Sequence, residues 1–230
     1  MRLTTRCMDL LRLLRGARWL TTSQVKRRFF GHVTPDAARK RLLKLTEADY
    51  LVRVQPDRTR EALFTLGREG KRVLEKAGSG EIVLEHRPPK QLEHFHAINH
   101  VRVAAELGGP VSFFFSCWEL PSLNWQYPII PDAVFSVRNK TFALELDRGM
   151  ERIQFFVRTK IAAYRNGLGG LPLTALLIVT EGNIRMESLA RAIGDGKGRI
   201  LYITIDLVEK HDITASIFRD SSNDGRVALV

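Results

Sequence analysis

Apolar residues recur at helical spacing in three stretches of the first fifty residues. Within residues 4–16, apolar side chains follow intervals of three and four and form one stripe. Residues 20–31 begin at a Thr/Ser cap and place Val25 and Phe29 on one face. Residues 34–51 open with a threonine cap, a proline and an aspartate, which is a strong helix start. The pattern predicts three helices.

After the third helix the pattern changes to runs typical of strands. Residues 50–56 and 61–67 are strand-like and are joined by the polar loop "DRTR", and residues 68–78 fit a short helix. Three helices followed by a hairpin is the order of a winged helix, whose third helix enters the major groove of DNA. The stretch resembles the winged-helix DNA-binding modules of bacterial regulators. We therefore expect a winged helix-turn-helix domain over residues 1–78.

The next segment, residues 79–90, has the Gly/Ser and Pro-Pro composition of a linker. Within it, residues 81–86 are expected to form a short strand. Residues 91–230 then alternate between helical and strand-like runs, which is typical of an α/β domain. Only Arg138 and Asn139 separate the second and third of these strands, so a hairpin is expected there.

The fold class predicted for the whole chain is α/β, in an α+β arrangement of two domains. The order of elements in residues 91–230 is α-β-β-β-α-β, which is the common core of restriction-endonuclease-like, PD-(D/E)XK, folds.

The charge of the chain is unevenly divided between these two parts. Residues 1–90 hold 21 Lys and Arg against 10 Asp and Glu, whereas residues 91–230 hold 15 of each. The whole excess of +11 therefore belongs to the first part. A basic module joined to a neutral one indicates that the first part meets a polyanion, most often nucleic acid.

Composition also indicates in which cellular compartment the protein is expected. No stretch reaches the roughly 18 apolar residues that a membrane helix needs. The basic, apolar N-terminus contains arginines throughout and is interpreted as a first helix and not as a signal peptide. Cys7 and Cys117 each lie inside an apolar run, as expected in a reducing cytoplasm. We expect a cytoplasmic protein with no membrane segment.

The third helix supplies the candidates for contact with double-stranded DNA. Arg39, Lys40 and Lys44 lie outside its apolar stripe, and Arg58 and Arg60 lie at the tip of the hairpin. Cations on a recognition helix and wing bind DNA phosphates and release condensed counterions, so binding should weaken steeply with salt. A winged helix that serves only protein contacts remains the alternative.

Carboxylates suggest a metal site in the second part. In active PD-(D/E)XK sites, an Asp and a Glu on neighbouring strands bind Mg²⁺, and a Lys two residues after the Glu stabilises developing charge. Asp132 of a Pro-Asp pair matches the first acid and Glu145 the second. Asp147 stands where the Lys is expected and shares the face of Glu145, because side chains alternate along a strand.

The missing cation can come from elsewhere in the sequence. Lys160 lies on the next helix, four residues before Tyr164, and Arg148 and Arg152 are further candidates. Each is equally credible as a salt-bridge partner that neutralises Glu145 and its neighbour. A structural or regulatory domain without chemistry, a working nuclease, and a non-catalytic binding site therefore all stay open.

A second possible metal site is weaker. His96 and His100 lie four residues apart on one face of a predicted helix, but no further ligand has suitable spacing. We interpret these histidines as packed side chains.

The motifs together resemble a known family. A winged helix, a linker, a His-bearing helix, "PDAVF", "ALELDRG" and a Lys-x-x-x-Tyr helix are similar to the replication-relaxation family of bacterial plasmids and mobile elements. The similarity covers nearly the whole chain. It implies a DNA-associated protein of mobile-element replication, mobilisation or transcription control.

The sequence thus predicts a sequence-specific DNA-binding protein, either a transcription regulator or an accessory factor of plasmid or mobile-element replication and mobilisation. Its nuclease-like domain is expected to be non-catalytic, to need no cofactor and to form a homodimer. The alternative is a Mg²⁺-dependent DNA endonuclease directed by its winged helix. In that case Asp132, Glu145, Asp147 and Lys160 are the catalytic residues, and the first two bind the metal.

Overall fold

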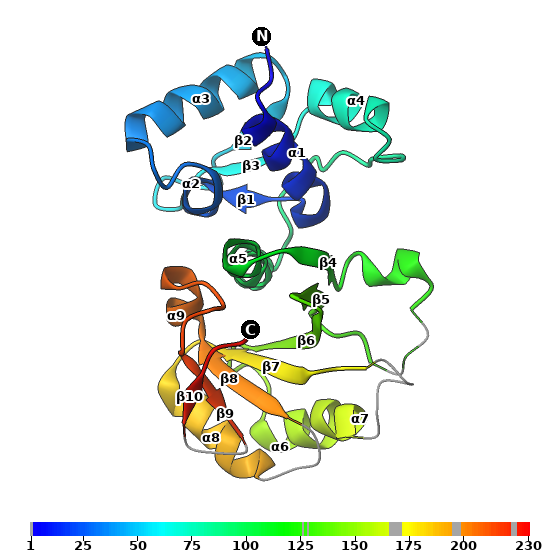
Figure 1. Cartoon of the computed structure of the whole chain (residues 1–230), viewed down its shortest axis with the longest axis vertical. Helices are drawn as coiled ribbons and strands as arrows, with labels where there is room; N and C mark the ends of the chain where they lie inside the picture. The colour runs from blue at the N-terminus through cyan, green and yellow to red at the C-terminus, as the bar shows by residue number, and fades with distance from the viewer. Residues whose placement is uncertain (1, 126, 128, 166–171, 195–198, 222–224) are drawn as a thin grey trace. The chain divides into compact units, whose positions relative to one another are not determined.

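The computed structural model describes residues 2–125, 127, 129–165, 172–194, 199–221 and 225–230 (Figure 1). The chain divides into two compact units, Met1–Asn99 and His100–Val230. Each unit is described by itself. In the described part of the chain, no helix combines the length and the apolar character needed to cross a bilayer.

Four helices form most of the first unit, and three of them begin at a threonine. The helices are α1 (Thr5–Ala17), α2 (Thr22–Phe29), α3 (Pro35–Glu47) and α4 (Arg68–Lys76). The side chains of Thr4, Thr21 and Thr34 each accept a hydrogen bond from a backbone N–H in the first turn that follows. Gln24 completes a capping box by accepting from the Thr21 N–H at 3.0 Å.

A small antiparallel sheet completes the unit. Its strands β1 (Leu20–Thr21), β2 (Leu51–Val54) and β3 (Leu63–Leu66) lie in the order β1-β3-β2. The central strand β3 is buried along its whole length, and the helices close over it. The sequence predicts β2 and β3, but β1 is only two residues long and was not predicted, because so short a run has no detectable alternation.

Residues 81–86 do not form the short strand expected of them, since no regular secondary structure is present there. The segment is nevertheless tied to the first unit. The Ile82 side chain is 4% exposed within the core cluster of this unit, and its backbone N–H donates to Glu75 Oε1 at 3.2 Å. Leu84 also packs against this cluster, and Glu85 pairs with Arg18 at 3.3 Å, so side-chain contacts hold the segment in place of strand pairing.

The second unit is built on a mixed sheet of seven strands in the order β10-β9-β8-β7-β6-β5-β4. The strands are β4 (Val111–Ser116), β5 (Ala133–Val137), β6 (Lys140–Asp147), β7 (Ala175–Thr180), β8 (Ile200–Thr204), β9 (Phe218–Asp220) and β10 (Arg226–Val227). The pairs on either side of β7 are parallel, and the other pairs are antiparallel. The predicted α/β class is confirmed.

Helices cover both faces of this sheet (Figure 1). One face carries a continuous helical segment of α6 (Ile153–Phe156), the π-helix η2 (Val157–Ile161) and α7 (Ala162–Arg165), together with α8 (Asn183–Ile193). The other face carries α9 (Ile205–Lys210) and the part of α5 (Leu92–Gly108) that belongs to this unit. A short 3₁₀ helix, η1 (Leu120–Leu123), follows β4. Strand β6 is therefore buried from both sides, and this burial sets the chemistry of its carboxylates.

Candidate functional site

The β5–β6 hairpin places Asp132 beside strand β6. The two-residue turn at Arg138 and Asn139 has positive φ at both positions, 47° and 62°, as a type I′ hairpin requires. At the far end of the hairpin, the Asp132 N–H donates to the Leu144 carbonyl at 3.0 Å. Asp132 Oδ2 accepts from the Leu146 N–H at 2.7 Å, so this carboxylate is fixed against the strand that carries Glu145.

Glu145 lies in the middle of the sheet with both carboxylate oxygens occupied. Its side chain is 1% exposed. Lys160 Nζ donates to Oε2 at 2.7 Å, and the Tyr164 hydroxyl donates to Oε1 at 2.6 Å. The π-helical turn that contains Lys160 leads directly into α7, which carries Tyr164, so one helical segment supplies both donors. The Lys160 ammonium also lies 5.3 Å from the centroid of the Phe156 ring.

Asp147 shares the face of Glu145, and its partners come from a different helix. Arg185, in the first turn of α8, donates from Nε to Oδ2 at 2.6 Å and from Nη2 to Oδ1 at 3.1 Å. The Gly149 N–H donates to Oδ1 at 2.9 Å. Arg185 Nη2 also reaches the Glu151 carbonyl at 2.6 Å, which ties α8 to the segment after β6. All four carboxylate oxygens of Glu145 and Asp147 accept hydrogen bonds from their own chain.

Burial and charge shift the proton affinities at Glu145. Burial, reinforced by the negative charge of Asp132, raises the pKa of Glu145 to about 7, against the opposing effect of Lys160 and Tyr164. Burial, together with the negative charge of Glu145, also raises the pKa of Tyr164, so the phenol stays protonated and donates. For Lys160, burial is the largest single effect and acts to lower the pKa, but the hydrogen bond and attraction to Glu145, together with the charges of Asp132 and Glu151, outweigh it and the pKa is raised.

The sequence hypothesis for the cations needs one correction. Arg148 does not neutralise Glu145 or Asp147, because its Nε donates to Glu181 Oε1 at 2.7 Å. The partner of Asp147 is Arg185, which the sequence analysis missed. A signal was available, since β6 and β7 are parallel and therefore end at the same edge of the sheet. The helix that starts after β7 begins beside Asp147.

The carboxylate oxygens of Glu145 and Asp147 accept hydrogen bonds from an ammonium, a guanidinium, a phenol and a backbone amide. A Mg²⁺ ion at these acids would have to share the oxygens with those donors or displace the donors. Among the residues that the structure describes, no group of three or more His, Cys, Asp or Glu side chains is placed to hold a metal. The arrangement can pair charges and bind the helices to the sheet.

A different kind of surface lies on α3 in the first unit. Arg39, Lys40 and Lys44 are all exposed on this helix. Lys40 lies 3.9 Å from the Asp36 carboxylate, one turn earlier. Within the described part of the chain, Arg39 and Lys44 have no ion pair. Their charges are therefore available to a ligand.

Residues 55–62 form the hairpin loop between β2 and β3, which we call the wing loop. Its two arginines differ in whether they have an acidic partner. Arg58 is exposed and has no ion pair among the described residues. Arg60 is engaged twice, by Glu93 at 2.6 Å and by Asp57 at 3.2 Å. Within the described residues, the five cations selected from the sequence therefore separate into three without an acidic partner and two that have one.

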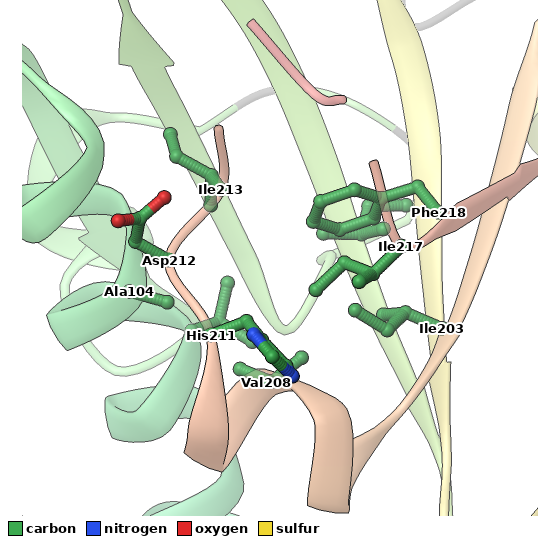
Figure 2. Close-up of a pocket in the computed structure, with 10 residues that line it drawn as sticks. Ala104, Ile203, Val208, His211, Asp212, Ile213, Ile217 and Phe218 are labelled. Carbon is green, nitrogen blue, oxygen red and sulfur yellow. The ribbon is translucent and has the colours of Figure 1, made fainter. Parts of the chain in front are cut away.

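A small, mostly apolar pocket is lined by residues of α5, β7, β8, α9 and β9 (Figure 2). Ala104, Ile203, Val208 and Phe218 are among the residues around it. His211 and Asp212 are its polar neighbours. Most of the lining is apolar, and we assign no chemistry to this pocket.

Comparison with known proteins adds a sequence family and a similarity to solved structures. Residues 11–170, more than two thirds of the chain, match the sequence family described as replication-relaxation. Among solved structures, the crystal structure of protein VC1899 from Vibrio cholerae is similar at 13% sequence identity and a TM-score of 0.34. The match covers 91% of this chain and 55% of that one, so the chain spans about half the length of that protein. No curated protein matches the chain.

Proposed function

The chain belongs to the replication-relaxation family, and on that premise we propose that it is a sequence-specific DNA-binding protein of replication or mobilisation. Control of transcription on a plasmid, a mobile element or the chromosome is the closely related role. The unit Met1–Asn99 binds the DNA in this proposal. The unit His100–Val230 has a nuclease-like order of elements and is proposed to act without catalysis.

The proposal treats the first unit as a winged helix. Its order of α1, α2, α3 and the β2–β3 hairpin matches that architecture, in which the third helix enters the major groove and the wing contacts the backbone. The observation that carries the proposal is the exposed face of α3, where Arg39 and Lys44 have no acidic partner in the described structure. Unpaired cations on an exposed recognition helix are suited to DNA phosphates and base edges.

The proposed absence of catalysis in the second unit rests on the carboxylates of β6. Asp147 occupies the position where nucleases of this class carry a lysine, and Arg185 holds it with two hydrogen bonds. Glu145 is likewise held by Lys160 and Tyr164. Each acid has its own internal partner, which is the arrangement expected of structural ion pairs.

The test of DNA binding removes the two unpaired cations of α3. Replacing Arg39 and Lys44 with alanine should weaken binding to a DNA fragment about 100-fold and reduce the slope of log K against log salt by about two. The matched control replaces Arg15 and Lys76, which are exposed cations on α1 and α4, and removes the same charge. Equal losses in the two variants would leave only general electrostatic attraction, and the assigned role of α3 would be wrong.

A second candidate function is a Mg²⁺-dependent DNA endonuclease, favoured by the 2.7 Å contact of Lys160 with Glu145. That contact puts a lysine beside the second acid even though it comes from a helix. The test incubates supercoiled DNA with the protein and Mg²⁺ or Mn²⁺, beside the variants Asp132→Ala and Glu145→Ala. Cleavage that both variants lose would replace the non-catalytic proposal. Intact DNA in all samples supports it.

The proposal places the protein in the cytoplasm. It also includes a homodimer, because a pair of recognition helices can read two half-sites of one operator. Light scattering with and without DNA measures the mass of the particle. A monomer under both conditions contradicts this part of the proposal and leaves the DNA-binding role of α3 intact.

A further inference from the structure

The wing loop is internally ordered, and this order fixes the position of Arg60. Gln55 Nε2 donates to the Asp57 carbonyl at 2.7 Å and to the Arg60 carbonyl at 2.6 Å. Asp57 Oδ1 accepts from the Thr59 N–H at 2.8 Å and from the Arg60 N–H at 2.9 Å. These bonds close the loop on itself. The backbone of Arg60 therefore has a defined direction before any ligand arrives.

The guanidinium of Arg60 is held by acids on both sides. Nη1 lies 2.6 Å from Glu93 Oε1, and Nε lies 3.2 Å from Asp57 Oδ2. Glu93 stands in the first turn of α5, 33 positions along the chain from Arg60. About half of each of these side chains is exposed, so solvent and a ligand can reach the pair. A charge-assisted bond of this length is at the short end of the usual range.

The neighbouring acid does not compete for this arginine. Glu61 Oε2 accepts from both the N–H and the hydroxyl of Ser23, at 3.2 Å and 2.7 Å. That carboxylate is occupied at the start of α2. Glu93 is therefore the acid outside the wing loop that faces Arg60.

We propose that the Arg60 guanidinium is a site for a backbone phosphate of DNA, and that the Glu93 carboxylate occupies this site as an internal phosphate mimic. Carboxylate and phosphate are interchangeable at a guanidinium, because both accept its parallel N–H donors through oxygens that carry negative charge. A phosphate must displace Glu93 before it gains the contact. The proposal rests on the DNA-binding role of the first unit and adds an internal competitor to it.

Arg58 lies in the same wing loop as Arg60 but is expected to bind phosphate differently. Arg58 has no acidic partner within the described residues, so a phosphate can bind it with no exchange. In the native protein, Arg58 should therefore contribute to affinity and Arg60 should contribute little. Glu93 makes the difference between the two arginines.

The experiment measures DNA affinity of Glu93→Gln over a range of salt concentrations. Freeing Arg60 should tighten binding about three- to tenfold at low salt and steepen the slope of log K against log salt by about one. The matched control is Glu69→Gln, which frees Arg72 from a 2.6 Å pair on α4 and makes the same change in net charge. The control should leave the slope unchanged.

A second substitution assigns the gain to the arginine. Adding Arg60→Ala to Glu93→Gln should abolish the whole gain of Glu93→Gln. Equal effects of Glu93→Gln and Glu69→Gln would overturn the proposal, and so would a loss for Arg60→Ala in the native protein as large as that for Arg58→Ala. If the native protein binds no DNA at all, the proposed function itself fails, a result distinct from both.

Discussion

Two charged regions of this protein use similar side chains in opposite ways. On α3, Arg39 and Lys44 are exposed and have no acidic partner in the described structure. On β6, Glu145 and Asp147 are buried, and their oxygens accept from the cations Lys160 and Arg185 and from two neutral donors. Only the first region has charge available for a ligand. The comparison teaches that a function must be assigned from the pairing of charges as well as from their kind.

The difference originates in the positions of the two elements. Helix α3 buries one stripe, Ala38, Leu42 and Leu45, and leaves the rest of its surface to solvent. Strand β6 lies between β5 and β7 and is covered by helices, so an ion there must find a partner or lose its charge.

The largest expected effect tests whether the charges on β6 are paired, and it is measured as the free energy of unfolding. Lys160→Met leaves the Glu145 carboxylate buried without its counter-ion and should lower the free energy of unfolding by about 3 kcal/mol at pH 8. Urea denaturation measures it. The double variant Lys160→Met, Glu145→Gln should recover most of the loss, because the buried charge is then absent as well. A cost below about 1 kcal/mol for the single variant would show that the pair is not structural.

The second largest effect on stability is expected for the ion pair of Arg185 with Asp147. Arg185→Met should cost about 2 kcal/mol, because Asp147 is 3% exposed and keeps only the Gly149 N–H among its donors described above. Arg148→Met is the matched control, since its partner Glu181 is half exposed and such pairs contribute at most about 1 kcal/mol. Equal costs for the two arginines would remove the distinction between buried and exposed pairing.

A pH dependence should appear in the second region. The folded-state pKa of Glu145 is raised from its ordinary 4.5 to about 7. Between these values the folded state holds the extra proton, so the free energy of unfolding falls as the pH rises, by at most about 1.4 kcal/mol per unit from this group. Above pH 7 this contribution levels off. Glu145→Gln should lack it, and parallel stability curves for the two proteins from pH 5 to 8 would contradict the assignment.

The smallest effect is expected in the first region. Replacing Arg39 and Lys44 with alanine should change the free energy of unfolding by less than about 0.5 kcal/mol, because neither side chain is buried or paired in the described structure. The same urea titration measures it. A large loss would mean that α3 is stabilised by these cations, and any loss of DNA binding would then need a structural explanation.

Sequence patterns could predict what local rules govern. The threonine caps, the spacing of the apolar stripes and the Arg138–Asn139 turn each depend on a few adjacent residues, and the corresponding helices and hairpin are present. The hairpin also places Asp132 beside β6. Strands β1, β9 and β10 were missed because each has only two or three residues.

Sequence patterns could limit the pairing of charges to the helices that follow β6 and β7, but they could not decide it. Lys160 and Arg185 lie 15 and 38 positions from the acids they bind, and several other cations were equally near in sequence. Which cation reaches which acid depends on how helices pack on the finished sheet. The same holds for Glu93, whose contact with Arg60 follows from the tertiary fold of the first unit.

The π-helical turn Val157–Ile161 has a consequence for comparison with related sequences. A π-turn contains one residue more than the α-helical turn it replaces. Removing one residue there would restore an α-helical turn, and the helix after it, which carries Tyr164, would keep its orientation relative to Phe156, whose ring is buried in the core. Relatives can therefore lack one residue in this turn and still direct a tyrosine at Glu145. A one-residue alignment gap between Phe156 and Lys160 would mark a relative in which an α-helical turn replaces the π-helical one.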